Sequence, residues 1–302
     1  MVNCKRKSLE SSYTKAALLF LTPSLAFFAV FFVFPLFFTL YLSFHEWDML
    51  SPLGEAKGIG LSNFAGLFSD SRFVKTLLNT FIYVGSNLVL MPVIALVIAL
   101  LLKSTKFLPR LWRLIFFLPV VTSVVAMSLV WQYIFDPTFG PLNEFLKALG
   151  LPPQGWTMAP SQSLPSILIV LLWQGAGYYA IIYLAGLMGI SRDYYEAAEL
   201  DGANGWQSFR SITLPFLRPT TEFVLVMIAV NTFQVFTPIF VITNGGPVDS
   251  SNVLGLYIYQ TAFEFLKMGK ASSMAVVLFV LVMSFSVIQI KIMRRNANGQ
   301  DE

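Results

Sequence analysis

Charged residues are scarce in this chain. Aspartate, glutamate, lysine and arginine together form 12% of its 302 residues, whereas soluble domains carry about 25%. Hydrophobic residues form 56%, so the composition points to a membrane protein before any motif is considered. The net charge is +4, but the basic residues lie near the ends of apolar segments. That placement indicates membrane topology rather than nucleic-acid binding.

Residues that usually build reactive sites are also scarce. The chain has one cysteine, Cys4, and one histidine, His45. A lone cysteine cannot form an internal disulfide, and one histidine is too few for a histidine-built metal site. The sequence has no G-x-x-x-x-G-K-[ST] phosphate-binding loop. We therefore expect a protein that is not an enzyme, with no catalytic residues, no metal site and no cofactor bound by this chain.

What the chain does contain is long apolar runs. Six segments are long enough to cross about 30 Å of hydrocarbon as helices, and none of them includes Asp, Glu, Lys or Arg. The first is too long for a signal-peptide core and lacks a convincing cleavage site, so we expect it to remain as a span. The predicted fold is an all-α polytopic membrane protein with six transmembrane helices. The segments lie near Ala16–Phe44, Thr76–Leu102, Leu114–Phe135, Leu164–Ser191, Phe223–Val248 and Ala271–Ile290.

The distribution of lysine and arginine predicts the orientation. Six spans leave both termini on one side of the membrane. If that side is the cytoplasm, the inside segments carry 14 of the 20 basic residues and the outside segments carry 6, as the positive-inside rule expects. We therefore predict a multi-pass protein of the cell membrane. It would have a cytoplasmic segment at 1–15, a membrane domain at 16–293 and a cytoplasmic tail at 294–302.

One segment on the predicted cytoplasmic side differs from the rest of the chain. It reads YYEAAELDGANGWQSF, from Tyr194 to Phe209, and is acidic and rich in alanine. Ser191 can cap a helix that starts there, and Gly202 can end it because glycine accepts the left-handed conformation. Asn204 with Gln207 three residues later resembles a capping box, so a second short helix is expected. The pattern predicts a helix–turn–helix.

The composition of this segment favours docking to a partner protein. Its two alanines allow a close backbone approach, and its acidic residues suit a basic surface. An amphipathic helix lying on lipid is the alternative, but such helices usually carry Lys and Arg on their polar face. Trp206 and Phe209 share the apolar face of the second helix. Pro215 and Pro219 are expected to break the chain before the next span.

The stretch EAAELDGANGWQSFRSITLP resembles the EAA loop of permease subunits in ABC importers. The matching positions are Glu196-Ala197-Ala198, Gly202, Ile212 and Leu214-Pro215. Ser191 stands where relatives commonly have proline, and a serine cap can start the helix as well. The resemblance implies a coupling loop at 191–215 that seats in a cleft of the ATP-hydrolysing subunit. The residues expected to serve the coupling are Glu196, Ala197, Ala198, Asp201, Gly202, Trp206, Phe209 and Pro215.

The likeness covers nearly the whole chain. TPSLAFFAVFFVFPL, GLSNF, WQGAGYYAIIYLAGL and NTFQVFTPIFVITNGGP are similar to segments of the maltose-type and glycerol-phosphate-type permeases. This resemblance implies a translocation subunit for a sugar or sugar-like solute. The implied partners are a second permease, a dimer of ATPase subunits that uses ATP and magnesium, and a solute-binding protein in the extracellular or periplasmic space.

Two other functions remain as alternatives. An ion-coupled secondary transporter would need charged groups within its spans, and the six segments have none. A non-transporting membrane scaffold is disfavoured only mildly, by polar faces on two spans. An intramembrane enzyme would need a Ser–His pair, paired carboxylates or a metal cluster. A third function, an intramembrane enzyme, is therefore disfavoured, because the single histidine, His45, lies at the end of a span.

Polar residues on the fourth and fifth spans are candidates for the solute pathway. Gln174, Gly175 and Tyr178 share one helix face. Amides and hydroxyls can bond sugar hydroxyls, while aromatic rings cover the apolar sugar face. Hydrogen bonding between helices is the alternative role. By resemblance to maltose-type permeases, the substrate-binding candidates are Gln174, Gly175, Tyr178, Asn231 and Thr232, and Gln234 lies nearby on the fifth span.

Overall fold

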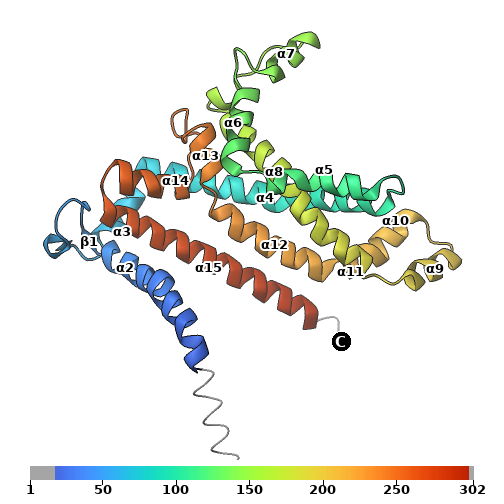
Figure 1. The fold of residues 1–302 in the computed structure, drawn as a ribbon, viewed down its shortest axis with the longest axis horizontal. Helices are drawn as coiled ribbons and strands as arrows, with labels where there is room; N and C mark the ends of the chain where they lie inside the picture. The colour runs from blue at the N-terminus through green and yellow to red at the C-terminus, as the bar shows by residue number, and fades with distance from the viewer. Residues whose placement is uncertain (1–17, 299–302) are drawn as a thin grey trace, which may run out of the picture. The chain divides into compact units, whose positions relative to one another are not determined.

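The computed structural model describes residues 18–298, and most of these residues are helical (Figure 1). The predicted segment at 1–15 lies outside the described residues, as do residues 299–302 of the predicted tail. The chain divides into two compact units. One comprises the described residues up to Leu67 together with Thr261–Val276, and the other comprises Phe68–Gln260 together with the described residues from Val277 onward.

The first unit contains the first apolar helix and a short hairpin. The helix Leu18–Ser43 includes a π-helical turn, η1 (Ala29–Val33), followed by α2 (Phe34–Ser43). Two two-residue strands, β1 (His45–Glu46) and β2 (Lys57–Gly58), pair antiparallel. They are a small exception to the expected all-α fold. Asn63, from the GLSNF segment, donates hydrogen bonds to the carbonyls of Ser43 and His45, both at 3.0 Å, and so fixes the end of the helix.

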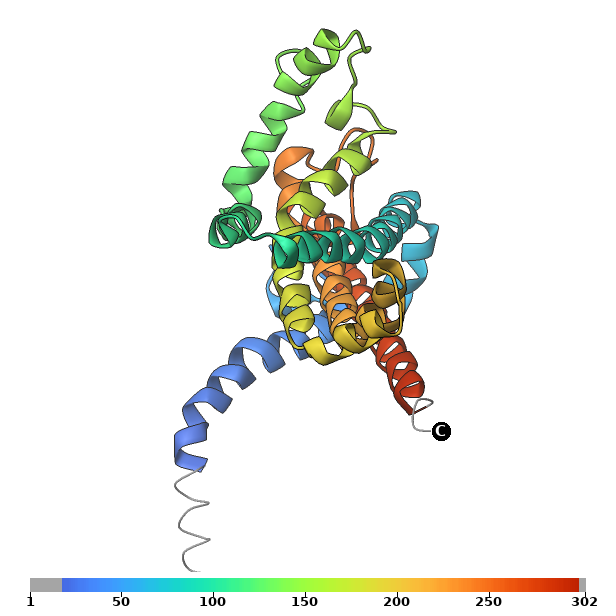
Figure 2. The same ribbon diagram turned by 90° about the vertical axis from the view of Figure 1, so that its right-hand side faces the viewer.

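Three long helices form the core of the second unit: α4 (Ser71–Ser104), α8 (Ser163–Met188) and α12 (Arg218–Phe233). They pack on one another, as Figures 1 and 2 show. Small residues permit this close packing, and Ala95, Ala99 and Ala180 are completely buried. Larger side chains fill the remaining space, among them Tyr183, Leu187, Leu217 and Ile228.

Shorter elements lie between the long helices along the chain. They are η2 (Leu53–Glu55), α3 (Ser62–Ser69), α7 (Pro141–Ala148), η3 (Trp156–Met158), α14 (Leu254–Tyr259) and η5 (Gln260–Glu264). The last helix, α15 (Met268–Asn298), continues past residue 293, where the sequence suggested that the membrane domain ends.

The third predicted span is bent rather than straight. It consists of α5 (Pro109–Val121) and α6 (Val124–Ile134), which meet at 96°. Thr122 is extended, and the Ser123 hydroxyl accepts a hydrogen bond from the Ala126 N–H as the cap of α6. Pro119 near the end of α5 removes one helical hydrogen bond. A new helix therefore starts in the middle of one apolar run, which hydropathy alone does not reveal.

The fifth predicted span is shorter than expected. The sequence suggested Phe223–Val248, but α12 ends at Phe233 and a separate helix, α13, covers Thr237–Ile242. Pro238 stands in the first turn of α13 and lacks the N–H that would bond the carbonyl of Gln234. Two bent pairs of helices occur, Pro109–Val121 with Val124–Ile134 and Gly205–Phe216 with Arg218–Phe233. By length and composition, the described residues hold four straight helices that could cross a membrane, or up to six if each bent pair is one span.

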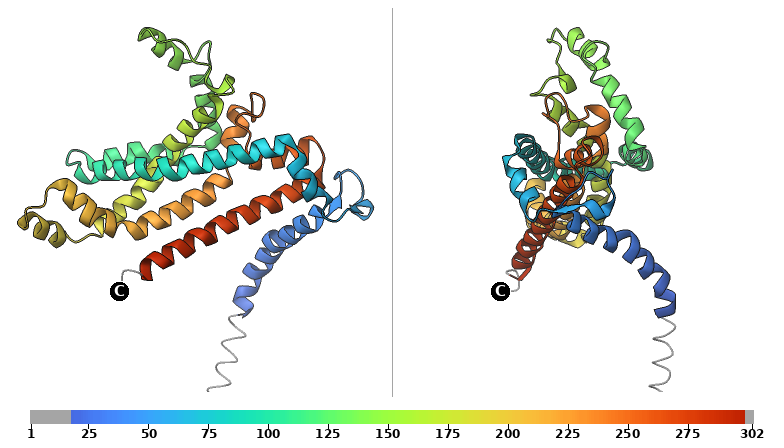
Figure 3. Two further views of the ribbon diagram at one scale, coloured as in Figure 1. Left: turned by 180° about the vertical axis from the view of Figure 1, so that it is seen from behind. Right: turned by 90° about the vertical axis from the view of Figure 1, so that its left-hand side faces the viewer.

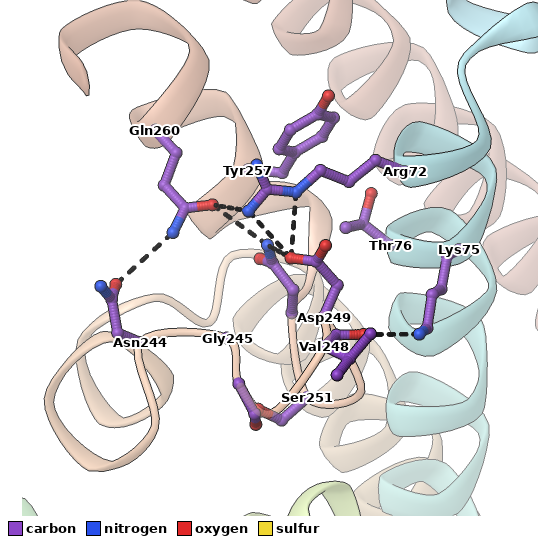
Figure 4. A network of polar contacts seen from close by, with 12 residues as sticks. Arg72, Lys75, Thr76, Asn244, Gly245, Val248, Asp249, Ser251, Tyr257 and Gln260 are labelled. Carbon is purple, nitrogen blue, oxygen red and sulfur yellow. Dashed lines mark hydrogen bonds and ion pairs between the residues drawn. The ribbon is translucent and has the colours of Figure 1, made fainter. Parts of the chain in front are cut away.

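A polar network holds the loop that follows α13 against the start of α4 (Figure 4). Arg72 forms an ion pair with Asp249 at 2.8 Å and donates to the Gln260 amide oxygen at 3.0 Å. Lys75 donates to the Val248 carbonyl at 2.6 Å. Val248 and Asp249 both have positive φ, 51° and 56°, which is unfavourable for non-glycine residues. The network therefore stabilises a loop conformation that the local sequence disfavours.

We expect Asp249→Ala to loosen this loop. The change removes the Asp249 carboxylate from the partly buried Arg72 guanidinium, at a cost of about 1.5–3 kcal/mol for a hydrogen bond between charged groups. Limited proteolysis of the purified protein should then cut faster within residues 244–253. Glu144→Ala is the matched control, because Glu144 pairs with Lys147 at the surface and exposed pairs contribute little. Equal cleavage rates in both variants would contradict the role given to the network.

Candidate functional site

A cavity of about 260 Å³ lies among α4, α8 and α12. Most of its lining groups are amides, hydroxyls, aromatic rings and aliphatic side chains, and none of them is an acid, a lysine or an arginine. Such a surface can form hydrogen bonds without imposing a charge. The lining residues are Tyr83, Asn87, Met91, Val120, Leu171, Gln174, Gly175, Tyr178, Tyr179, Ile228, Asn231, Thr232 and Val235.

Five of the six substrate-binding residues predicted from sequence lie together at this cavity. Gln174, Gly175 and Tyr178 come from α8, while Asn231 and Thr232 come from the last turn of α12. The predicted helix face on α8 is therefore brought against the end of α12 by packing. The sixth residue, Gln234, is the C-cap of α12 and is not part of the lining, although its neighbour Val235 is. Whether these residues bind solute remains a prediction.

The polar groups of the cavity differ in their hydrogen-bond partners. The Asn231 amide donates to the Tyr179 hydroxyl at 3.2 Å, and the Thr232 hydroxyl donates to the Ile228 carbonyl at 2.6 Å. The Asn87 amide donates to the Tyr83 carbonyl at 3.0 Å. Asn231 therefore bonds across two helices, which is the alternative role considered from sequence. The bond uses a single amide hydrogen, so the rest of the Asn231 amide can still reach a solute.

The two glycines in this part of α8 have different surroundings. A β-carbon on Gly175 would come within 2.7 Å of the Met91 methyl group, so this glycine keeps space between α8 and α4 beside the cavity. A β-carbon on Gly177 would clash with the Phe116 carbonyl of α5. Gly177 therefore permits close helix packing, and Gly175 shapes the cavity as well.

Sequence reasoning missed the contribution of α4. Tyr83, Asn87 and Met91 recur every four residues and line the cavity from one helix face. Asn79 extends this row toward the helix start, where its amide donates to the carbonyls of Asp249 and Asn252, both at 2.9 Å. The signal was present in the sequence, because polar residues within a span usually face the interior of the bundle.

The acidic segment forms two short helices joined by a turn. α9 (Arg192–Leu200) begins after Ser191, whose hydroxyl accepts from the Asp193 N–H at 3.3 Å. Gly202 has φ of +81°, as a helix-ending glycine requires. The Gly202 N–H donates to the Glu199 carbonyl at 3.0 Å and the Ala203 N–H to the Ala198 carbonyl at 2.9 Å. These two bonds form a Schellman motif that ends α9.

The second helix of this segment starts with the predicted capping box. The Asn204 N–H donates to the Gln207 side chain at 2.7 Å, and the Gln207 N–H donates to the Asn204 side chain at 3.0 Å. α10 (Gly205–Ser208) then continues through a π-helical turn, η4 (Phe209–Thr213), into α11 (Leu214–Phe216). Figures 1 and 3 show this segment at the same end of the second unit as the end of α8.

The helical structure breaks between the two prolines of this segment, at Leu217. Pro215 lies in α11 and Pro219 in the first turn of α12, where a missing N–H costs no helical hydrogen bond. The segment Gly205–Phe216 meets α12 at 63°. The predicted break before the next span is therefore present, with one proline on either side of it.

The surface of the segment carries exposed apolar and acidic groups. Leu200 and Trp206 are 90% and 69% exposed, and the Trp206 ring stacks on Phe209 with centroids 5.5 Å apart. Glu196 lies 3.6 Å from Arg192 in an exposed ion pair, which is easily exchanged for another partner. Two large apolar side chains and an exposed carboxylate are therefore accessible on this segment.

Comparison with known proteins agrees with this architecture. The family described as "Binding-protein-dependent transport system inner membrane component" matches residues 58–296. The chain belongs to this family. It is the integral membrane, permease subunit of an ABC importer rather than an ion-coupled transporter or a scaffold, and hydrolysis of ATP belongs to a separate subunit.

Relatives of this permease cover almost its entire length. It is 35% identical to the "Probable ABC transporter permease protein YurN" of Bacillus subtilis, over 94% of this chain and 97% of that protein. It is 33% identical to the "Lactose transport system permease protein LacF" of Rhizobium radiobacter, over 94% and 97%. A chain in the crystal structure of a bacterial alginate ABC transporter has the same fold, with a TM-score of 0.83, 24% identity and 96% of each chain covered.

Proposed function

We propose that this permease imports a sugar or sugar-like solute and that the solute contacts the cavity between α4, α8 and α12. The main support is that Gln174, Tyr178 and Asn231 line the same cavity, whose lining has no charged side chain. Tyr83 and Asn87 add further polar groups from α4. Amides and hydroxyls match the hydroxyls of a sugar, and the aromatic rings match its apolar face.

The names of relatives support this solute class. LacF is named for lactose transport, AmyD of Thermoanaerobacterium thermosulfurigenes for starch degradation products, and the solved alginate transporter was crystallised with a periplasmic protein bound to an alginate pentasaccharide. Alginate is described as acidic, whereas the cavity of this chain has no basic side chain. We therefore propose a neutral saccharide as the solute.

We further propose that α9 and α10 form the coupling segment, which docks on a cytoplasmic ATPase dimer. Glu196, Asp201 and Trp206 would contact the ATPase, and Gly202 would set the angle between the two helices. Both chain termini would then lie in the cytoplasm, in agreement with the excess of lysine and arginine on that side. A second permease would complete the pathway, and a solute-binding protein would deliver the solute from outside.

Reconstitution tests this function. The permease would be placed in liposomes with its neighbouring permease, ATPase and binding protein, and uptake would be measured for neutral and acidic oligosaccharides. We expect uptake of a neutral saccharide that requires both ATP and the binding protein. Transport by the permease alone, or uptake limited to charged solutes, would contradict the proposal.

A further inference from the structure

Lys103 connects the ends of three helices in the second unit. It lies in the last turn of α4, and its ammonium donates to the Leu187 carbonyl in the last turn of α8 at 3.1 Å. The same ammonium lies 5.2 Å from the centroid of the Tyr195 ring on α9. One charged group therefore contacts α8 and α9 from α4.

Each of these contacts has a physical reason. The last carbonyls of a helix have no partner within the helix and carry partial negative charge, so the end of α8 attracts a cation. The face of a tyrosine ring is also negative and attracts an ammonium within about 6 Å. The contacts with α8 and α9 therefore both depend on the positive charge of Lys103.

Tyr195 extends the connection to the second half of the coupling segment. Its hydroxyl forms a hydrogen bond with the Thr213 hydroxyl at 2.9 Å, which joins α9 to η4. A cavity of about 540 Å³ lies beside these residues, with Lys103, Tyr195, Glu199, Phe209 and Thr213 in its lining. Because this space is not filled by side chains, tight packing does not connect the coupling segment to α4 there, and Lys103 reaches across instead.

The two helices joined at Lys103 also carry the proposed solute site. Asn87 on α4 lies 16 residues before Lys103, or about 24 Å along a helix. Gln174 on α8 lies 13 residues before Leu187, or about 20 Å. A displacement of the end of either helix is transmitted along its length, because a hydrogen-bonded helix resists compression.

We propose that Lys103 is a positioning residue that passes movement of α9 to α4 and α8, and so links the coupling segment to the cavity. The inference rests on the proposed docking of α9 and α10 on the ATPase. It assigns a role to a residue that lies outside the proposed coupling segment and outside the lining of the proposed solute cavity.

The test measures uptake and ATP hydrolysis in the same proteoliposomes that contain the complete transporter. Lys103→Met keeps the length of the side chain and removes its charge. We expect the uptake per ATP hydrolysed to fall by about tenfold, within the range of coupling between distant sites, while ATP hydrolysis changes by less than about twofold. Lys103→Arg should restore most of the coupling, because guanidinium also bonds carbonyls and stacks on aromatic rings.

Lys106→Met is the matched control. Lys106 lies three residues further along, is exposed and should tolerate the change without effect on coupling. Tyr195→Leu removes the ring from the other side of the contact. If the ring and the ammonium act together, the double variant Lys103→Met with Tyr195→Leu should be no worse than the more impaired single variant, because coupled residues are not additive.

The outcomes separate this inference from the function on which it rests. Normal coupling in Lys103→Met, or an equal loss of ATP hydrolysis, uptake and membrane abundance, would overturn the role of Lys103. If Gly202→Pro, which reshapes the docking segment itself, also left coupling intact, the docking function would fail as well. Loss of coupling in Gly202→Pro alone would leave the docking function standing and refute only the connection through Lys103.

Discussion

Gly202→Pro is expected to abolish solute uptake while the permease still inserts into the membrane. Gly202 has φ of +81°, whereas proline is restricted to about −65°. Its N–H also donates to the Glu199 carbonyl in the motif that ends α9, and proline has no N–H. A local cost of about 3 kcal/mol corresponds to a loss of about a hundredfold, because α10 would leave α9 in another direction.

The measurement is uptake of labelled solute by vesicles that contain the complete transporter, with permease abundance followed by immunoblot. Gly205→Ala is the matched control, since Gly205 has no positive φ and a β-carbon there would touch nothing. Glu196→Lys tests the same surface without altering the backbone, by reversing a carboxylate that faces solvent. Normal uptake in both Gly202→Pro and Glu196→Lys would refute the docking role.

Asn231→Leu is expected to raise the KM for uptake by about tenfold, which corresponds to the loss of roughly one hydrogen bond. Leucine has a similar volume but cannot donate to a solute or to the Tyr179 hydroxyl, which lies 3.2 Å from the Asn231 amide nitrogen. Assembly with the ATPase should persist, because Asn231 is remote in sequence from the coupling segment. Initial uptake rates over a range of saccharide concentrations would measure the change.

Two further variants distinguish solute binding from helix packing. Gln234→Leu is the control, because Gln234 lies on the same stretch of chain but outside the cavity lining. It should change KM by less than about twofold. Tyr179→Phe removes the hydroxyl that Asn231 bonds and keeps the ring. If Tyr179→Phe reproduced the entire defect of Asn231→Leu, Asn231 would serve the contact between α8 and α12 rather than the solute.

The features predicted most accurately from sequence were those governed by neighbouring residues. The Ser191 cap, the stop at Gly202 and the capping box of Asn204 with Gln207 are all present. Each depends on hydrogen bonds between residues two to five positions apart, so no tertiary contact is needed to specify it. The face shared by Gln174, Gly175 and Tyr178 was predictable for a similar reason, because helical periodicity fixes it.

Features that depend on distant packing were not predictable in the same way. The 96° bend between α5 and α6 interrupts a continuous apolar run, and either a straight or a bent helix would satisfy its hydropathy. Gln234, at the end of α12, does not line the cavity, whereas Val235 does. Tyr83 and Asn87 line the cavity only because α4 packs against α8 and α12.

The sequence by itself determined that this chain lies in a membrane and where the segment Tyr194–Phe209 turns. Apolar length, helix caps and glycine conformation are local properties, and each is readable from a few adjacent residues. Only the tertiary structure decided which faces of α4, α8 and α12 enclose a cavity and that Lys103 contacts both Leu187 and Tyr195. The physical reason is that such contacts join residues distant in sequence, 52 positions apart for Tyr179 and Asn231 and 84 for Lys103 and Leu187, and helical periodicity sets the faces of each helix but not their partners.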